Sequence, residues 1–286
     1  MKKEPVQAVY LPVEKLRPFE GHPFQVIDNE EMDQLIWSVV TRGVLTPLVV
    51  RPLENGDYEV ISGHRRLRAC QKAGIQTVPS LVYALDRDTA AIALVDSNLH
   101  REHILPSEKA FAYKLKMEAM NHQGTSGQVG QKWTRDEIAE NGTDSSRQIQ
   151  RYIRLTNLEP ELLKIVDEGK ISLTPAVELS YLRSNEQKYL LDTMELSGST
   201  PSYSQAVNLR KASQLNALTT DLIDHIMAEP KANQKEKISF RMDDIRKYFP
   251  RNFNAIQIQQ TILALLNAYQ KQYQRQQPSH QDELSR

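Results

Sequence analysis

Three arginines at helical spacing are the residues of this chain best suited to binding an anion. Arg147, Arg151 and Arg154 are separated by four and three residues, and the segment 145–155 contains no acidic side chain. At about 100° of rotation per residue, the three fall within a helical stripe about 60° wide. The opposite side of this helix is apolar, with Ile149, Tyr152 and Ile153. The spacing therefore predicts an amphipathic helix whose polar face carries one sign of charge.

A helix with this face could bind double-stranded DNA. Arginine and glutamine side chains match the edges of guanine and adenine in the major groove, and Gln148 and Gln150 flank the arginines. The alternative is an ordinary solvated helix, but such helices usually mix signs and place acids four residues from bases. We therefore interpret residues 145–155 as a DNA-recognition helix.

The preceding residues complete a helix-turn-helix pattern in KWTRDEIAENGTDSSRQIQRYIRLTNL, residues 132–158. Thr134 and Glu137 have capping-box spacing, so a short first helix is expected to start at Thr134. Asp144 or Ser145 suits the N-cap of the second helix, which would lie in the major groove. The candidate DNA contacts are Thr134, Ser145, Ser146, Arg147, Gln148, Gln150, Arg151 and Arg154.

A second candidate anion site lies where an apolar run meets a helix, in VISGHRRLRACQKAGI, residues 60–75. Free backbone N–H groups and the helix dipole favour an anion at a helix start, and Gly63 would let a ligand approach the backbone. Arg65 and Arg66 add forked donors that match phosphate oxygens. Arginines at a helix start are also commonly surface charges, so this stretch alone leaves both interpretations open.

Oxygen-bearing side chains and an arginine follow a predicted helix in VDSNLHREHILPSEKA, residues 95–110. Asp96, Ser97 and Asn98 end that helix, and Arg101 comes three residues later. Oxygen ligands beside an arginine suit a magnesium-bound phosphate group. A capped helix end followed by a loop would explain the same residues.

Three regions are expected to position these side chains. Residues 1–103 alternate short apolar strands with amphipathic helices, which predicts an α+β domain. Residues 104–228 have helical patterns throughout, interrupted by a polar, glycine-rich loop at 123–132. Residues 229–286 contain a charged linker, one apolar helix and a polar tail.

One helix of the first region has a well-defined pattern, in DNEEMDQLIWSVVTRG. Asp28 and Glu31 have capping-box spacing, and Gly43 suits the C-terminal end. The residues expected on its apolar face are Met32, Leu35, Ile36, Val39 and Val40.

The composition bounds the class of protein. The 286 residues include 36 basic and 36 acidic side chains, so a uniformly basic DNA coat protein is disfavoured, whereas a local basic stripe is not. The single cysteine, Cys70, excludes a disulfide framework and a cysteine-rich zinc site. No apolar run approaches about 18 residues and no secretory pattern opens the chain, so we expect a cytoplasmic, nucleoid-associated protein.

Taken together, these motifs resemble those of ParB-type partition proteins, especially the branch found on mobile elements. GVLTPLVVRP looks like the family's Gly-Pro-Val-Arg strand entry, SGHRRLRA like its Gly-Glu-Arg-Arg box, and SNLHRE like its Glu-Asn-x-x-Arg box. The resemblance covers about residues 7–195. It implies an α+β N-terminal ParB/sulfiredoxin-like domain, an all-α helix-turn-helix domain and a small helical C-terminal region.

As a family these proteins bind centromere-like DNA and bind and hydrolyse CTP, so the resemblance implies a nucleotide site in this chain. Its residues would be Thr46, Pro47, Gly63, His64, Arg65, Arg66, Asn98 and Arg101. Asn98 would also act at Mg²⁺. The resemblance further implies a homodimer that closes as a clamp around DNA, and a Walker-type partition ATPase as partner.

The chain departs from the family pattern at three places. His64 and Ser97 stand where the family has glutamate, and HPFQV stands in place of a Gln-Pro-Arg segment. The resemblance therefore implies nucleotide binding and leaves CTP hydrolysis open.

Two other functions compete with partition. One is a transcriptional or nucleoid-occlusion regulator built on the same scaffold. The other is an enzyme, since the N-terminal fold is shared with sulfiredoxin and with a free-serine kinase. Sulfiredoxin needs a cysteine where Gly63 stands, and no catalytic acid for a kinase is evident, so an enzyme of either kind is disfavoured.

Overall fold

The computed structural model describes residues 8–101, 103–123, 138, 144–229, 245–250 and 252–276. They belong to two compact units, residues 1–232 and 233–286. Most of the predicted first helix of the helix-turn-helix, with Thr134 and Glu137, lies outside the described residues, and so does nearly all of the glycine-rich loop.

A five-stranded sheet forms the framework of the N-terminal region, in the order β1-β5-β3-β4-β2. The strands are β1 (Val9–Pro12), β2 (Leu16–Pro18), β3 (Leu48–Pro52), β4 (Tyr58–Ser62) and β5 (Thr77–Val82), with a short 3₁₀ helix η1 (Val13–Lys15) between β1 and β2. β3 runs antiparallel to β4 and parallel to β5. β1 runs antiparallel to β5, and β2 parallel to β4. Because β3 and β4 are antiparallel neighbours, the start of β3 lies beside the end of β4, where Gly63 follows.

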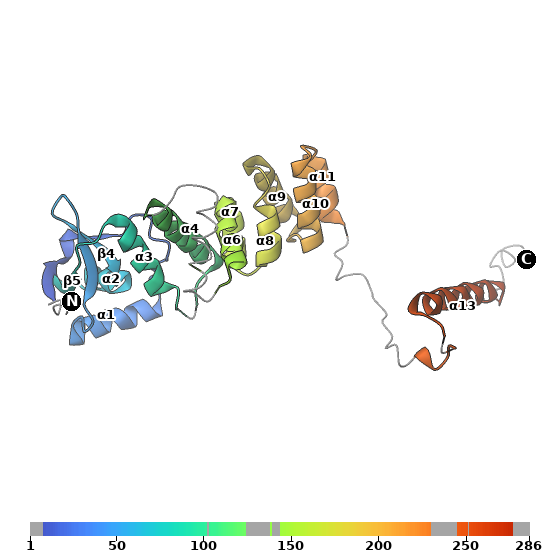
Figure 1. Ribbon diagram of the computed structural model, residues 1–286, viewed down its shortest axis with the longest axis horizontal. Coiled ribbons are helices and arrows are strands. Elements are labelled where there is room, and N and C mark those ends of the chain that lie inside the picture. The colour runs from blue at the N-terminus through green and yellow to red at the C-terminus, as the bar shows by residue number, and fades with distance from the viewer. Residues whose placement is uncertain are drawn as a thin grey trace, which may run out of the picture. The chain divides into compact units, whose positions relative to one another are not determined.

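Two helices, α1 (Glu30–Arg42) and α2 (His64–Lys72), pack against each other and cover an apolar layer of the sheet (Figure 1). Their buried residues include Met32 and Val39 of α1 and Leu67 and Cys70 of α2. The predicted helix after Gly63 is thus confirmed, and α2 follows directly after β4, an inner strand of the sheet.

The capping prediction for α1 was wrong. The N-cap is Asn29, whose Oδ1 accepts a hydrogen bond from the Met32 N–H at 3.1 Å. Asp28 instead pairs with Arg68 and Lys72 of α2, at 2.8 Å in each case. These two cations come from a distant part of the sequence, so local spacing could not reveal them.

The apolar face of α1 is also narrower than predicted. Val40 is 62% exposed. It lies about 80° around the helix from Met32, at the edge of the stripe that meets the sheet. Leu35 and Ile36 pack against the core as expected.

The helices α3 (Arg87–Asn98) and α4 (Pro106–Gln123) pack side by side and continue the domain away from the sheet (Figure 1). Their shared core contains Phe19, Phe24, Ile61, Leu94 and Ala112. α4 also contacts α6 and α7, so it belongs to the packing of both the sheet region and the helical region.

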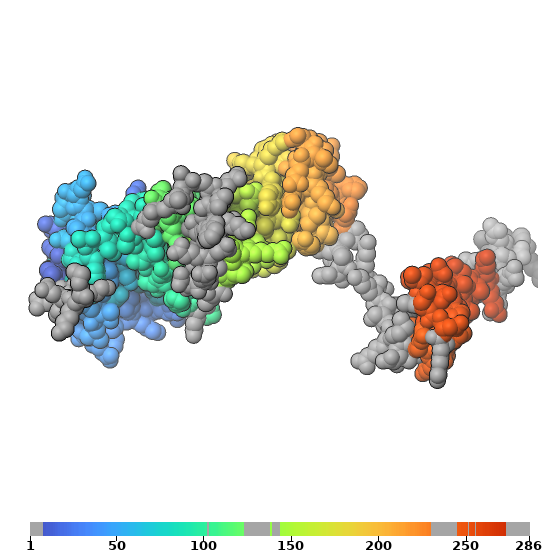
Figure 2. Space-filling view, viewed as in Figure 1, coloured from blue at the N-terminus to red at the C-terminus, as the bar shows by residue number. Residues whose placement is uncertain are grey.

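The remaining helices of the first unit share a separate apolar core. They are α6 (Ser146–Arg154), the 3₁₀ turn η2 (Leu155–Asn157), α7 (Pro160–Asp167), α8 (Leu173–Leu179), α9 (Ser184–Ser197), α10 (Tyr203–Gln214) and α11 (Thr220–Ala228). Leu162, Leu179, Leu190 and Leu209 are buried at its centre. The space-filling view shows α9 to α11 packed into one continuous surface (Figure 2).

The second unit contains the helix α13 (Ala255–Gln276). Leu263, Leu265 and Leu266 of this helix are each more than half exposed. None of the helices in the described part of the chain is both long and apolar enough to cross a bilayer.

Candidate functional site

Gly63 shapes the start of α2. It is the N-cap residue and has φ +106°, in a left-handed region that L side chains rarely adopt. A Cβ atom there would lie 3.0 Å from Leu48 Cγ and 3.1 Å from a terminal nitrogen of Arg66. No side chain caps this helix end. The first backbone N–H groups of α2 are therefore available to an anion, and only glycine fits beside them.

Arg66 ties this helix start to the entry of β3. Its Nη1 donates to the carbonyl oxygen of Thr46 and to that of Pro47, the latter at 2.8 Å. Burial lowers the pKa of this guanidinium from its usual value. Three predicted nucleotide residues, Thr46, Pro47 and Arg66, are thus brought together, with Gly63 in contact with Arg66.

Arg65 and Arg101 lie close to this site. Arg65 forms an ion pair of 3.0 Å with Glu31, an exposed residue of α1. Burial lowers the pKa of Arg101, Glu108 raises it, and the positive charge of Arg65 lowers it again. The charge of Arg65 therefore acts on Arg101. That both bind a nucleotide stays a prediction.

His64 points into the domain rather than toward the helix start. Its Nε2 accepts a hydrogen bond from the Phe19 N–H at 3.3 Å, and its ring lies 3.8 Å from that of His22. Burial, followed by the neighbouring His22 and then by the charge of Arg101, lowers the pKa of His64 to about 3; burial lowers the pKa of His22 to about 4. Both rings are therefore neutral at physiological pH, and His64 could reach a phosphate only through its backbone N–H.

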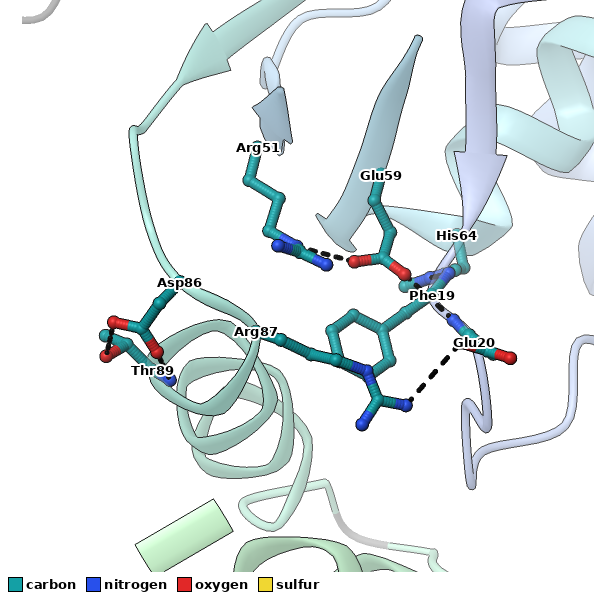
Figure 3. A network of polar contacts seen from close by, with 8 residues as sticks. All are labelled: Phe19, Glu20, Arg51, Glu59, His64, Asp86, Arg87 and Thr89. Carbon is teal, nitrogen blue, oxygen red and sulfur yellow. Dashed lines mark hydrogen bonds and ion pairs between the residues drawn. The ribbon is translucent and has the colours of Figure 1, made fainter. Parts of the chain in front are cut away.

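A polar network fixes the loop after β2 beside these rings (Figure 3). Glu59, a buried residue of β4, pairs with Arg51 of β3 at 2.6 Å and accepts the Glu20 N–H at 3.1 Å. Arg87 of α3 approaches Glu20 at 3.7 Å and lies over the Phe19 ring. The role of Glu59 was not predicted, because its partners Arg51 and Glu20 lie on other segments of the chain.

The predicted oxygen cluster at the end of α3 is dispersed. Asn98 is 5% exposed, and its Nδ2 donates to the Leu94 carbonyl at 2.7 Å and to Ser97 Oγ at 3.2 Å. Asp96 turns toward α4, where its Oδ1 lies 2.5 Å from Nζ of Lys116. Only Asn98 therefore faces the interior near Arg101, whose backbone N–H donates to the Asn98 carbonyl at 3.2 Å.

The helix predicted at residues 145–155 is confirmed as α6. Of the two candidate N-caps, Ser145 is the one used, since its Oγ accepts the Gln148 N–H at 3.2 Å. Ile149 is fully buried and contacts Ile138, which is the described residue of the preceding segment, and Tyr113 of α4. The apolar face thus packs inward as predicted.

Asp144 forms side-chain contacts with α4 that the sequence did not predict. Its Oδ2 accepts hydrogen bonds from Nζ of Lys109 at 2.9 Å and from the Tyr113 hydroxyl at 2.6 Å. Burial and then this hydrogen bond raise the pKa of Tyr113. Both partners belong to α4, so Asp144 anchors the residues just before α6. The spacing of 31 to 35 residues hides this contact from local pattern analysis.

The arginines of α6 have no carboxylate partner among the described residues. Arg147 is exposed. Arg151 donates to Gln148 Oε1 at 3.2 Å and to Thr174 Oγ1 at 2.6 Å. Arg154 donates to the side chain and carbonyl of Ser180, at 3.2 and 3.0 Å. These partners are neutral, so they orient the guanidinium groups without cancelling their charge.

A pocket of about 260 Å³ borders Arg147 and Arg151. It is lined by Arg147 and Arg151 of α6, by Thr174, Val177 and Glu178 of α8, and by Tyr203 at the start of α10. Ser145 and Gln150 are exposed beside it, and Ser146 and Gln148 are partly buried. The surface that contains the arginines thus extends onto α8 and α10, which sequence reasoning missed.

Tyr181 holds the last arginine of the face in place. The Arg154 guanidinium carbon lies 3.9 Å from the centre of the Tyr181 ring, and that of Arg210 lies 4.5 Å from it. Arg210 is neutralised by Glu178 at 2.8 Å, whereas Arg154 is not. Tyr181 lies in a loop between two helices and Arg210 inside a third, so no local sequence pattern connects them with Arg154.

Two family models cover the two regions that contain these sites. Residues 1–99 match the ParB N-terminal domain, and residues 102–200 match the ParB HTH domain. The chromosome-partitioning protein Spo0J of Thermus thermophilus is 32% identical over 205 residues, which are 71% of this chain and 71% of that protein. The chain belongs to the ParB family. The fold predicted from the motifs, an α+β ParB domain followed by a helix-turn-helix domain, is confirmed for this ParB-family protein.

Nucleoid occlusion proteins are relatives of similar strength. That of Geobacillus sp. (strain WCH70) is 31% identical over 191 residues, 66% of this chain. The chain spans 64% of the length of that relative, which is less than two thirds.

Solved structures of ParB from Caulobacter crescentus also match. The form complexed to the centromeric parS site is 24% identical, covers 71% of this chain and 98% of that one, and has a TM-score of 0.43. The form complexed with CTP-gamma-S is 26% identical, covers 63% and 95%, and has a TM-score of 0.31. These TM-scores are too low for a comparison of individual sites.

Proposed function

We propose that this ParB-family protein binds specific double-stranded DNA sites through α6 and serves in DNA partition. The observation that carries the proposal is the arginine face, which has no carboxylate partner in the described part of the chain. Three guanidinium groups on one helix repel each other, so their arrangement favours binding of a polyanion. The buried opposite face supports the same conclusion, because it fixes which side of α6 is presented.

Each arginine has a distinct part in this proposal. Arg147 and Arg151 border the pocket and would reach base edges, for which arginine is the most common specific partner. Arg154 is held by Ser180 and Tyr181, so it would contact the phosphate backbone and set the register of the helix. Gln150, which is exposed beside them, would contribute a further base contact.

We further propose that CTP binds at the start of α2 and controls DNA binding. The backbone of Gly63 and the first turn of α2 would receive phosphates, together with Arg65, Arg66 and Arg101. The base would lie near Thr46 and Pro47. Because Arg66 contacts both carbonyl oxygens of that segment, it would link the phosphate end of the nucleotide to the base end. The resemblance also implies Mg²⁺ at Asn98, and there the donor set of this chain does not fit, as argued below.

The proposal includes a homodimer, association with the nucleoid and a Walker-type ATPase as partition partner, all of which follow from the resemblance. Nucleoid occlusion is the second candidate function, since relatives of that name match about as well as the partition protein. The two differ in what they mark: partition acts on one locus, whereas occlusion needs sites spread over the chromosome.

Selection of bound fragments from the host genome tests the function. The purified protein is incubated with sheared genomic DNA, with and without CTP, and the retained fragments are sequenced. We expect one enriched motif whose occupancy changes with CTP, and no enrichment with the Arg151→Ala variant. Lys188→Ala, which removes an exposed cation of α9, is the matched control and should enrich the same motif. Enrichment at one locus supports partition, and dispersed sites support occlusion. No enriched sequence would contradict the proposal.

A further inference from the structure

The end of α3 offers few oxygen ligands for a metal ion. The amide nitrogen of Asn98 is used inside the helix, by the Leu94 carbonyl and Ser97 Oγ. One amide oxygen of Asn98 therefore remains. Protein-bound Mg²⁺ usually takes one or two carboxylates besides phosphate oxygens and water.

The carboxylates closest in sequence are already engaged. Asp96 pairs at 2.5 Å with Lys116, a lysine whose side chain is only 7% exposed, so withdrawing Asp96 would leave a buried cation unpaired. Glu108 accepts the N–H groups of Gln25 at 2.8 Å and of Leu105 at 3.0 Å. Within the described ranges, no three histidine, cysteine or acidic side chains lie close enough together to hold a metal ion.

The charge of the site has the opposite sign from that of a metal site. Arg65, Arg66 and Arg101 contribute three guanidinium groups. Arg66 has neutral carbonyl partners only, whereas Arg65 pairs with the exposed Glu31 and Glu108 acts on Arg101, so positive groups outnumber these carboxylates. His22 and His64 lie beside Arg101 and add no negative charge. Ser97, a neutral residue, occupies the position directly before Asn98.

We propose that this protein binds the triphosphate of a nucleotide without a divalent cation, using the three guanidinium groups to neutralise the phosphate charge. The proposal rests on the nucleotide site of the proposed function. Forked arginine donors match phosphate oxygens directly and need no bridging ion. The missing carboxylate is the reason for the difference, so supplying one at position 97 should create a requirement for metal.

Calorimetric titration of the full chain with CTP, in EDTA and in MgCl₂, tests this inference. We expect dissociation constants that agree within about threefold, a difference of less than 1 kcal/mol. A loss of about tenfold or more in EDTA that MgCl₂ restores would overturn the inference and leave the proposed nucleotide site intact. Absence of binding in both buffers would overturn the nucleotide site itself and the inference with it.

Ser97→Glu and Ser97→Ala form the matched pair of variants. Ser97→Glu is expected to bind CTP at least about fivefold more tightly in MgCl₂ than in EDTA. Ser97→Ala should bind CTP with the same affinity in both buffers, as the parent chain does. Indifference of Ser97→Glu to the metal, with its thermal unfolding unchanged, would contradict the role assigned to the missing carboxylate.

Discussion

The arginines at the start of α2 and those along α6 show two ways in which a fold prepares cations for an anion. At α2, Arg66 turns back onto the backbone carbonyls of Thr46 and Pro47, and Arg65 reaches Glu31. On α6, Arg151 and Arg154 donate hydrogen bonds to the side chains of Thr174 and Ser180. In both places the closest contacts orient the guanidinium groups. The α6 set differs in that its three arginines follow one side of a single helix and have neutral partners in the described part of the chain, with Arg147 exposed.

The difference teaches which ligand each place can accept. A recessed set of donors around a glycine suits a small anion that can reach the backbone, such as a triphosphate. A row of arginines along one side of a helix suits an extended polyanion such as a duplex. The same residue type thus serves both, and its surroundings decide between them.

The largest expected effect comes from removing the central arginine of α6. Arg151→Ala should weaken binding to the selected DNA site by about 1–3 kcal/mol, roughly 5- to 150-fold, because two hydrogen bonds orient this side chain at the surface of α6. Fluorescence anisotropy with the labelled site measures the loss. CTP binding should be unchanged. Equal DNA affinity of the variant and the parent protein would contradict the proposal that α6 binds DNA.

Arg66→Ala tests the other side of the comparison. We expect CTP affinity to fall about tenfold or more, since the fork that joins both ends of the nucleotide is lost. DNA binding without nucleotide should not change. Arg68→Ala is the control, because Arg68 lies on the same helix and pairs with Asp28. Calorimetry measures the CTP affinity of both variants. An equal loss of CTP affinity in both would indicate a general effect of removing a positive charge.

Tyr181→Leu should have a smaller effect on DNA binding alone. Without the ring, Arg154 loses its stacking partner, which is worth about 0.5–1 kcal/mol at an exposed site, or two- to fivefold in affinity. Tyr189→Leu, an exposed tyrosine of α9, is the control. A change in CTP affinity with Tyr181→Leu would show that the two sites are not separate in the way proposed.

Mild acid should affect the N-terminal region through its histidines. Folding lowers the pKa of His22 to about 4 and that of His64 to about 3, from 6.5. Between these values the unfolded chain binds protons that the folded chain does not, so stability falls as the pH drops from about 6.5 toward 4. The unfolding temperature, followed by circular dichroism, should therefore decrease by a few degrees between pH 7 and 5. A His64→Gln variant should lose less. An unfolding temperature independent of pH would contradict the buried, neutral state of the two rings.

Periodicity and capping predicted much of the fold, because these signals are local. α6 and α2 begin where the sequence placed them, and Ile149 is buried as its position required. The errors lie where a distant residue competes for a side chain. Asp28 fails as a cap because α2 supplies two cations, and Asp144 because α4 supplies an ammonium and a hydroxyl.

The candidate sites were predictable in residue type and only partly in surroundings. Arg66 and Gly63 stand together because they are three residues apart on one helix start, a relation that the sequence contains. The contacts of Arg154 with Ser180 and Tyr181 depend on how α8 crosses α6, which no spacing reveals. The roles of the candidate nucleotide and DNA contacts, and domain ends at residues 103 and 228, remain predictions.

Two of the lysines of α4, Lys109 and Lys116, connect this helix to the two candidate sites. Lys116 pairs with Asp96 at the end of α3, and Lys109 pairs with Asp144 directly before α6. Seven residues separate them, so they lie about two turns apart on nearly the same side of the helix. One residue added between them would turn one lysine by about 100° away from its partner. The spacing between Lys109 and Lys116 is therefore fixed, and a homologous chain with one residue inserted between them should have lost one of the two ion pairs.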